Sequence, residues 1–302
     1  MRRAWWPLVL ALVFPSVAFA QRFDDVGVRA QGMAGAFVAV ADDASATWWN
    51  PAGLATGLTF VDASVQVADG GLRGVAMAFP SLGVSYYRLK ISQIQPLAST
   101  AAASSGRQDN GAAGSGLPSV DAGLSQFGAT FGQSINPHLV VATTVKLVSA
   151  QGDTQADLDV GAMAVVGAMR LGVTVRDVRA PTFGSGSAAL TLDRRARAGA
   201  AFIAPARGPF ERLVFSVDAD LVTATAGGRD EREVAGGVEA WWPGRRIGVR
   251  GGAGANTVAG GGSFAALGVT VVPYPRMNLE AAVTRGADST RDQWSLGLRL
   301  TF

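Results

Sequence analysis

Side chains that commonly carry out catalysis or bind transition metals are scarce in this sequence. It contains a single histidine, His138, and no cysteine. One histidine could serve a serine hydrolase, but no Gly-x-Ser-x-Gly motif is present. His138 also stands beside Asn136 and Pro137, which is typical of a turn. We therefore expect no enzymatic activity, no metal site and no cofactor.

Two adjacent carboxylates, Asp42 and Asp43, are the next candidates for chemistry. Such a pair could bind Ca²⁺ weakly. A capping role is the favoured interpretation, because the small residues at 44–46 could form one helical turn that Asn50-Pro51 then ends. The glycine-rich stretch at 251–254 lacks the strand-to-helix setting of a nucleotide-binding loop, so it indicates turn or lumen-facing glycines.

Charged residues change sign from one segment of the chain to the next. Asp157 and Asp159 precede Arg170 and Arg176, Arg195 and Arg197 precede Asp218 and Asp220, and Glu233 and Glu239 precede Arg246 and Arg250. On neighbouring antiparallel strands, opposite charges can pair across the ladder. Two interpretations stay open. The charges could link the wall of a barrel and narrow its lumen, or they could be hydrated wall residues.

The elements that would position these charges are β-strands of alternating polarity. Fourteen segments of about 8 to 12 residues follow residue 57: 58–67, 72–79, 82–90, 123–132, 138–148, 155–166, 169–177, 194–203, 211–221, 231–242, 245–254, 262–272, 275–284 and 291–302. The last is the clearest, with Trp294, Leu296, Leu298, Leu300 and Phe302 on one face. The even number is that of a single-chain bacterial barrel.

Loop lengths favour a membrane barrel over a soluble sandwich. With both chain ends on the periplasmic side, the connections after even-numbered strands should be short turns. They fall at sites such as Pro80-Ser81, Gly167-Ala168 and Pro243-Gly244, whereas the two longest connections, 91–122 and 178–193, follow odd-numbered strands. The tryptophans at 48–49, 241–242 and 294 and Tyr274 are expected near strand ends, as an interface girdle.

Composition agrees with a barrel in a bacterial outer membrane. Only 16% of residues are charged, against about 25% in soluble domains. No apolar run past residue 20 is long enough for a spanning helix, and a membrane protein without such helices must be a closed barrel. The net charge is +3 and the basic residues are scattered, so nucleic acid is not an expected partner. The expected partner is outer-membrane lipid.

The chain divides into three expected parts. Residues 1–20 have the pattern of a cleaved signal peptide, with Arg2 and Arg3, an apolar run and Ala18-Phe19-Ala20. Residues 21–57 do not alternate like strands, and Gly32 and Gly35 among alanines favour close packing inside a crowded lumen. We predict that 21–57 is a plug and that 58–302 is an all-β transmembrane antiparallel barrel.

The predicted plug carries a motif. It comprises Arg29-Ala30, the run 32–36 with Gly32 and Gly35, Ala41-Asp42-Asp43 and Asn50-Pro51-Ala52-Gly53. The motif resembles the N-terminal signature of the long-chain fatty acid transporter superfamily of outer-membrane barrels, most closely the PorV/PorQ-like branch. The resemblance implies fourteen strands with an N-terminal hatch. It implies either a gated channel for small hydrophobic molecules or a secretion-linked scaffold that binds exported proteins.

Overall fold

The structure is a computed structural model. It describes residues 26–57, 61–93, 120–185, 189–205, 208–226, 229–258, 261–287 and 291–302. The predicted signal peptide, 1–20, lies outside the described residues.

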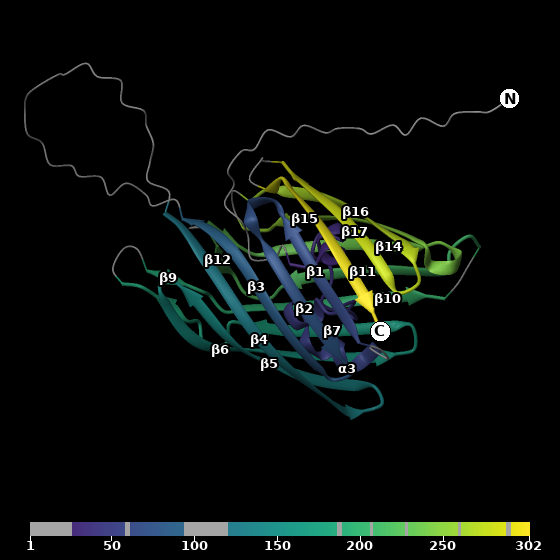
Figure 1. The fold of residues 1–302 in the computed structure, drawn as a ribbon, viewed down its shortest axis with the longest axis horizontal. Helices are drawn as coiled ribbons and strands as arrows, with labels where there is room; N and C mark the ends of the chain where they lie inside the picture. Colours follow the sequence, from purple (N-terminus) through teal and green to yellow (C-terminus); the bar gives the residue numbers. More distant parts are fainter. Residues whose placement is uncertain are drawn as a thin grey trace, which may run out of the picture.

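Fourteen antiparallel strands form one closed barrel (Figure 1). They are β1 (Asp62–Ala68), β2 (Arg73–Phe79), β3 (Leu82–Gln93), β4 (Val120–Asn136), β5 (Leu139–Ala150), β6 (Asp153–Val166), β7 (Met169–Arg176), β10 (Arg195–Ala204), β11 (Arg212–Asp220), β14 (Glu233–Trp241), β15 (Ile247–Asn256), β16 (Ser263–Tyr274), β17 (Met277–Gly286) and β18 (Gln293–Thr301). The first and last strands pair, with Val65 opposite Leu298, and this closes the wall. The predicted fold class is confirmed.

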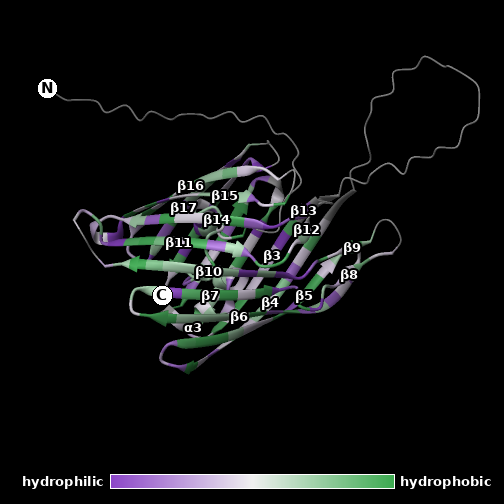
Figure 2. Cartoon of the chain, turned by 180° about the vertical axis from the view of Figure 1, so that it is seen from behind, coloured by the Kyte–Doolittle hydropathy of each residue, from purple (hydrophilic) through white to green (hydrophobic). Residues whose placement is uncertain are grey.

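Alternation along the strands separates an apolar outer face from a polar inner one. Leu171, Val217 and Leu267 are 55%, 61% and 65% exposed, whereas the neighbouring Arg170, Ser216 and Gly268 turn inward. The strands are accordingly banded in apolar and polar colours (Figure 2). Such a surface suits lipid, in which a closed barrel pairs all its backbone groups internally.

Two short hairpins extend the barrel at one end, which we call the hairpin end. β8 (Thr182–Phe183) pairs with β9 (Leu190–Thr191), and β12 (Ala224–Ala226) pairs with β13 (Arg229–Glu231). Both lie in connections that follow odd-numbered strands. The strand predicted to begin at residue 231 therefore begins at Glu233, because Glu231 already pairs with Ala224 in its own hairpin.

The N-terminal segment lies inside the barrel. It forms the short helices α1 (Val28–Gly32), α2 (Ala46–Trp49) and α3 (Leu54–Gly57) and a 3-10 turn, η1 (Pro51–Gly53). All residues from 26 to 54 are buried except Gly27 and Asp42, which are half-buried. We call residues 26–57 the plug. Within the described ranges, no helix is long and apolar enough to cross a membrane.

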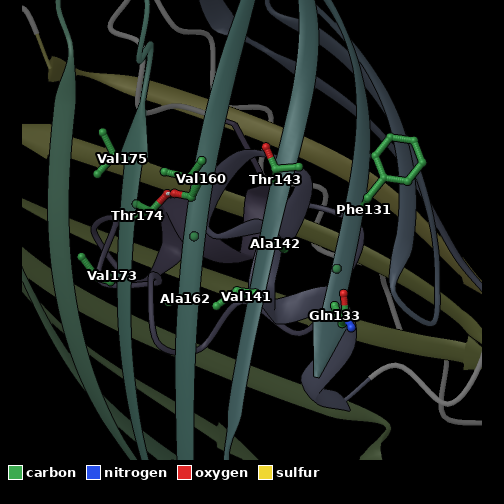
Figure 3. Close-up of a pocket in the computed structure, with 12 residues that line it drawn as sticks. Phe131, Gln133, Val141, Ala142, Thr143, Val160, Ala162, Val173, Thr174 and Val175 are labelled. Atoms are coloured by element: carbon green, nitrogen blue, oxygen red, sulfur yellow. Dashed lines mark hydrogen bonds between the residues drawn. The ribbon is translucent and has the colours of Figure 1, made fainter. Parts of the chain in front are cut away.

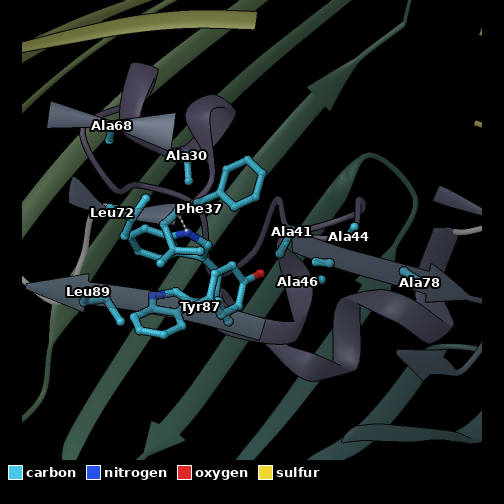
Figure 4. Close-up of a cluster of buried hydrophobic side chains, with 14 of the residues drawn as sticks. Ala30, Phe37, Ala41, Ala44, Ala46, Ala68, Leu72, Ala78, Tyr87 and Leu89 are labelled. Atoms are coloured by element: carbon cyan, nitrogen blue, oxygen red, sulfur yellow. Dashed lines mark hydrogen bonds between the residues drawn. The ribbon is translucent and has the colours of Figure 1, made fainter. Parts of the chain in front are cut away.

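Plug and wall share one hydrophobic core. Figure 4 shows plug residues such as Phe37 and Ala46 beside Leu72, Tyr87 and Leu89 of the wall. Trp48 and Trp49 are 0% and 3% exposed in this core, so their predicted place in an interface girdle is wrong. Trp241 is only 7% exposed, so the prediction is wrong for it too, whereas Trp242, Trp294 and Tyr274 are exposed at 38%, 37% and 70%. The plug tryptophans gain more from burial in the lumen than a strand-end position would give them.

Wall glycines make room for the plug. A Cβ on Gly161 would lie 2.2 Å from Asn50 Oδ1 and 2.9 Å from Pro51 Cδ, and a Cβ on Gly172 would lie 2.7 Å from the Val38 carbonyl oxygen. The wall thus supplies backbone surface where a side chain would collide with the plug.

Gly161→Val is therefore expected to destabilise the packing of the plug without changing any charge. Overpacking of a filled core costs about 1–3 kcal/mol, and thermal unfolding followed by circular dichroism would measure it. Gly251→Val is the matched control, because on the outer face its Cβ would meet the Leu267 side chain at 3.4 Å and the Ala266 carbonyl oxygen at 3.8 Å, which are ordinary contact distances. Equal unfolding temperatures for the two variants would contradict the packing role of Gly161.

Candidate functional site

Arg29 of α1 is the centre of the contact between plug and wall. Its Nε and Nη2 donate to the Glu239 carboxylate at 2.6 and 2.8 Å, and its Nη1 donates to Asp42 Oδ1 at 2.5 Å and to Asp43 Oδ2 at 3.1 Å. Arg29 is 3% exposed and Glu239 0%. A planar guanidinium can hold a carboxylate with two parallel bonds, so Arg29 fastens the plug to β14 from inside the barrel.

Asp42 extends the same network to two further strands. Its Oδ2 lies 2.9 Å from Arg212 Nη2 on β11 and 3.6 Å from Arg170 Nη1 on β7. Burial raises the pKa of Asp42, but the charges of Arg29, Arg212 and Arg170 outweigh burial and hold this pKa well below its usual value. Asp42 is thus an ion-pair partner of the wall rather than a helix cap. Asp43 accepts hydrogen bonds from the Ser45 backbone N–H and hydroxyl, at 3.0 and 2.5 Å.

The lowered pKa of Asp42 predicts a pH-dependent effect of Asp42→Asn. A carboxyl whose folded pKa lies below its unfolded value of about 3.9 stabilises the fold above that pH, and the contribution decreases as pH falls below it. The loss in free energy of unfolding, about 3–5 kcal/mol for a broken buried pair, should be constant above about pH 6 and shrink below about pH 4. Denaturant unfolding across this range measures it.

Asp292→Asn is the control for that series. Asp292 pairs with Arg285, which is 56% exposed, and such surface pairs contribute about 0–1 kcal/mol. A loss for Asp42→Asn that grew on acidification would contradict the assignment.

Backbone groups of the plug are also held by wall side chains. Asp218 Oδ2 accepts the N–H groups of Phe37 and Val38, both at 2.8 Å. Asn50 donates to the carbonyl oxygens of Val38, at 3.0 Å, and Ala162, at 3.2 Å, and accepts from the N–H of Ala52. Asp218 was predicted as a wall charge that pairs across strands, and here its contact is with the plug backbone.

The remaining residues of the sequence motif fit the plug closely against the wall. A Cβ on Gly32 would lie 2.7 Å from Arg250 Cγ. Gly35 has a φ of +76°, which favours glycine. Pro51 lies against Gly161, and Ala52 packs with Met163 in a second buried cluster.

A compact charge cluster lies at the hairpin end of β5 and β6. Lys146 Nζ lies 2.6 Å from Asp159 Oδ1, 2.6 Å from Asp177 Oδ1 and 3.3 Å from Asp157 Oδ2. The three carboxylates have the spacing of a cation site, and the Lys146 ammonium occupies its centre. Asp157 and Asp159 also accept the backbone N–H groups of Arg179 and Asp177, at 3.0 and 2.8 Å. The cluster therefore holds the base of the β8–β9 hairpin.

The other predicted lumen charges divide into paired and exposed residues. Arg197 Nε lies 2.6 Å from Asp220 and its Nη2 3.6 Å from Glu233, on the neighbouring and next strand. Arg195 lies 3.6 Å from Glu231, and Arg250 lies 3.5 Å from Glu239. Arg246 differs from the prediction: it is exposed at the end of the turn η4 (Pro243–Arg245), because the inward row of β15 begins only at Gly248.

Several charges of the network were absent from the sequence prediction. Arg29, Lys146 and Asp177 are the main ones. Arg29 lay within the recognised motif, and Lys146 alternates in phase with the inward Thr144 and Val148. The sequence thus contained a pattern that could have placed both residues inside the barrel. Asp177 had no such pattern, since it follows the last residue of β7.

An apolar cluster fills the lumen between the plug and the hairpin end. Phe183, Leu190 and Leu192, in and beside the β8–β9 hairpin, are 0%, 7% and 4% exposed, and they belong to the same cluster as Trp48. Trp48 meets Tyr87 edge to face, with ring centroids 5.2 Å apart. The wall adds Leu72, Leu89, Leu124 and Val148. An apolar cluster thus lies beside the Lys146 charge cluster at this end of the lumen, and we call this end the mouth; the level of Arg29 and Asp42 is lined by charges.

Two grooves lie in the outer wall rather than in the lumen. The first, of about 590 Å³, is lined by strands β4 to β7, and Figure 3 shows its valines and Phe131 with the plug behind the strands. The second, of about 760 Å³, is lined mainly by alanine and glycine of β10, β11, β14 and β15. Phe131 and Val217 in them are 53% and 61% exposed, so both grooves lie on the outer face of the barrel.

Comparison with solved structures finds the same fold. No protein-family model matches the chain, and no curated protein matches its sequence. The CymD monoaromatic hydrocarbon channel is 11% identical, with a TM-score of 0.62 over 91% of this chain and 97% of that one. A FadL homologue of Pseudomonas aeruginosa is 12% identical, with a TM-score of 0.59 over 95% and 99%. The TodX deltaS2S3 mutant, also a monoaromatic hydrocarbon channel, is 12% identical, with a TM-score of 0.52 over 91% and 98%.

Proposed function

We propose that this chain is an outer-membrane channel for small hydrophobic solutes, exported by its signal peptide and gated by its N-terminal plug. The observation that carries the proposal is a lumen with two levels, an apolar cluster at the mouth and below it a plug that contacts the wall through buried ion pairs and hydrogen bonds as well as apolar side chains. The likeness in fold to CymD and TodX, which are hydrocarbon channels, supports the same assignment.

The two levels suggest how solutes would be selected. Phe183 and Leu190 are 0% and 7% exposed, so a solute reaches them once the β8–β9 hairpin moves aside; an apolar solute then gains about 25 cal/mol per Å² buried. A hydrated ion gains nothing there. Passage beyond the mouth requires the plug to shift, since Trp48 and Phe37 fill the lumen below it. Hydrogen bonds and ion pairs allow such a shift, because each can be exchanged for water one at a time.

A reversible cross-link between plug and wall would test this gate. A Cβ on Gly297 of β18 would lie 3.6 Å from Val28 Cβ on α1, within the range of a disulfide. The chain has no cysteine of its own, so Val28→Cys with Gly297→Cys forms a single defined bond. Uptake of a monoaromatic hydrocarbon would be followed in vesicles with a lipopolysaccharide outer leaflet.

We expect uptake by the parent chain, its loss in the oxidised double variant and its recovery on reduction. Each single-cysteine variant is the matched control and should transport with or without oxidant. Undiminished uptake with the plug cross-linked would refute the gate, and no uptake by the parent chain would refute the channel.

A second candidate is a scaffold that binds exported proteins, as the PorV-like resemblance suggests. The observation in its favour is the extent to which buried ion pairs anchor the plug, since Arg29 alone joins Asp42, Asp43 and Glu239. A permanently closed barrel would act through its exposed end. Affinity purification from native membranes separates the two functions, because a stoichiometric exported protein is expected only for the scaffold.

A further inference from the structure

A small cavity lies at the boundary between plug and wall. Val38 and Trp49 of the plug form one side, and Arg176, Arg195 and Arg197 of β7 and β10 form much of the other. About 20 Å³ is open to a water-sized molecule, and one such occupant needs about 10–15 Å³. The cavity therefore has room for one water molecule or one monatomic ion.

Three arginines and one carboxylate line this cavity, and Arg195 and Arg197 have carboxylate partners at 3.6 Å or less. Arg176 and Arg195 are direct partners across the ladder of β7 and β10, and like charges in that position repel. The carboxylate nearest to Arg176 is Asp159, at 4.0 Å from Nε, and Asp159 is already 2.6 Å from Lys146. Arg176 is thus the least neutralised of the three arginines.

Arg176 also has donors without an acceptor. Its side chain is 6% exposed, and neither Nε nor Nη2 has a hydrogen-bond partner. Its guanidinium stacks on the Trp48 ring, with Cζ 3.7 Å from the centroid, and this stacking fixes its orientation. Buried donors of this kind are nearly always satisfied, so an acceptor in the cavity is required.

The cavity is richer in hydrogen-bond donors than in acceptors. Asp220 is its only carboxylate, and its Oδ1 already accepts from Arg197, its Oδ2 from the Glu233 N–H at 2.8 Å. The Thr174 hydroxyl donates to the Val160 carbonyl oxygen. A water molecule could accept from Arg176 but would leave its charge uncompensated, whereas a monatomic anion accepts from several donors and compensates that charge.

We propose that this cavity binds one small monovalent anion of the halide class, held chiefly by Arg176 of β7 at the boundary between plug and wall. The site is separate from any solute path. Polyatomic anions such as carboxylates and phosphates exceed its volume.

Bromide in place of chloride tests the site directly. Crystals of the full chain grown in bromide should show an anomalous peak in the cavity, within hydrogen-bond reach of Arg176. A peak without anomalous signal would identify water and overturn the proposal. This measurement uses the parent chain and does not depend on the folding of any variant.

A solution test adds matched variants. At equal ionic strength, chloride should raise the unfolding temperature of the detergent-solubilised chain above its value in gluconate, by about 5 °C when chloride is at about 100 times its Kd. Arg176→Met should abolish this difference. Arg246→Met, at the exposed turn, should retain it. Equal temperatures in the two salts for the parent chain, or a chloride effect that survives Arg176→Met, would overturn the proposal.

Discussion

A chain without residues 26–57 is expected to form an open, ion-conducting pore. The plug fills the lumen at the level of Arg29 and Trp48, and the wall there includes glycines such as Gly161 and Gly172 that project no side chain. A fourteen-stranded barrel is too wide for its own wall side chains to fill. Removing the plug should therefore leave a hydrated channel lined by charges, with conductance in planar bilayers rising by more than about tenfold.

The deleted chain must be shown to fold before its conductance is interpreted. Heat-modifiable migration on gels, compared with the full chain, reports the closed barrel. The control for conductance is the full chain with Gly251→Val, which carries an outer-face substitution and an intact plug. A folded deletion variant that conducts no better than this control would show that the plug does not occlude the barrel.

Lys146→Met is expected to be the most destabilising single substitution in the wall. It removes the ammonium from among Asp157, Asp159 and Asp177, whose side chains are at most 2% exposed. Removing one partner from a buried ion pair costs about 3–5 kcal/mol, and here three carboxylates lose the same cation. Chemical denaturation should show this loss. The control is Val145→Met, at the residue that precedes Lys146. Val145 lies on the outer face and is 49% exposed, so this change should alter stability by less than about 0.5 kcal/mol.

Calcium provides a second readout for this cluster. One oxygen from each of the three carboxylates lies within 4.8 Å of the others, and Ca²⁺ accepts several carboxylate oxygens. Added Ca²⁺ should therefore restore part of the stability of Lys146→Met and leave the parent chain unchanged. If Ca²⁺ affected both proteins equally, the view that Lys146 occupies a cation position would be wrong.

The barrel wall could be predicted from the sequence because an apolar outer face and a polar inner face impose a period of two on every strand. Trp294 to Phe302 alternates with polar residues, and the structure places this segment as β18 beside β1. Loop lengths also indicated a barrel, since short turns such as Pro80-Ser81 alternate with long connections. Local patterning is sufficient here because each strand only has to pair with its neighbours along the chain, apart from the closing pair.

Partners of individual charges could be predicted only in part. The alternation of sign anticipated pairs such as Arg197 with Asp220, which lie on adjacent strands in register. The prediction was wrong for Asp218, whose Oδ2 accepts the backbone N–H groups of Phe37 and Val38. It was also wrong for Arg246, which lies in a turn. Register within a ladder follows from local sequence, but the choice between a wall partner and a plug partner does not.

By itself the sequence determined the wall, with its strand number, its two faces and the presence of a distinct N-terminal motif. Only the tertiary structure decided what this motif contacts. Arg29 meets Glu239, 210 positions away, and Trp48 stacks under Arg176. The physical reason is that a plug inside a barrel has no periodic relation to its wall, so these contacts depend on how the closed lumen is filled.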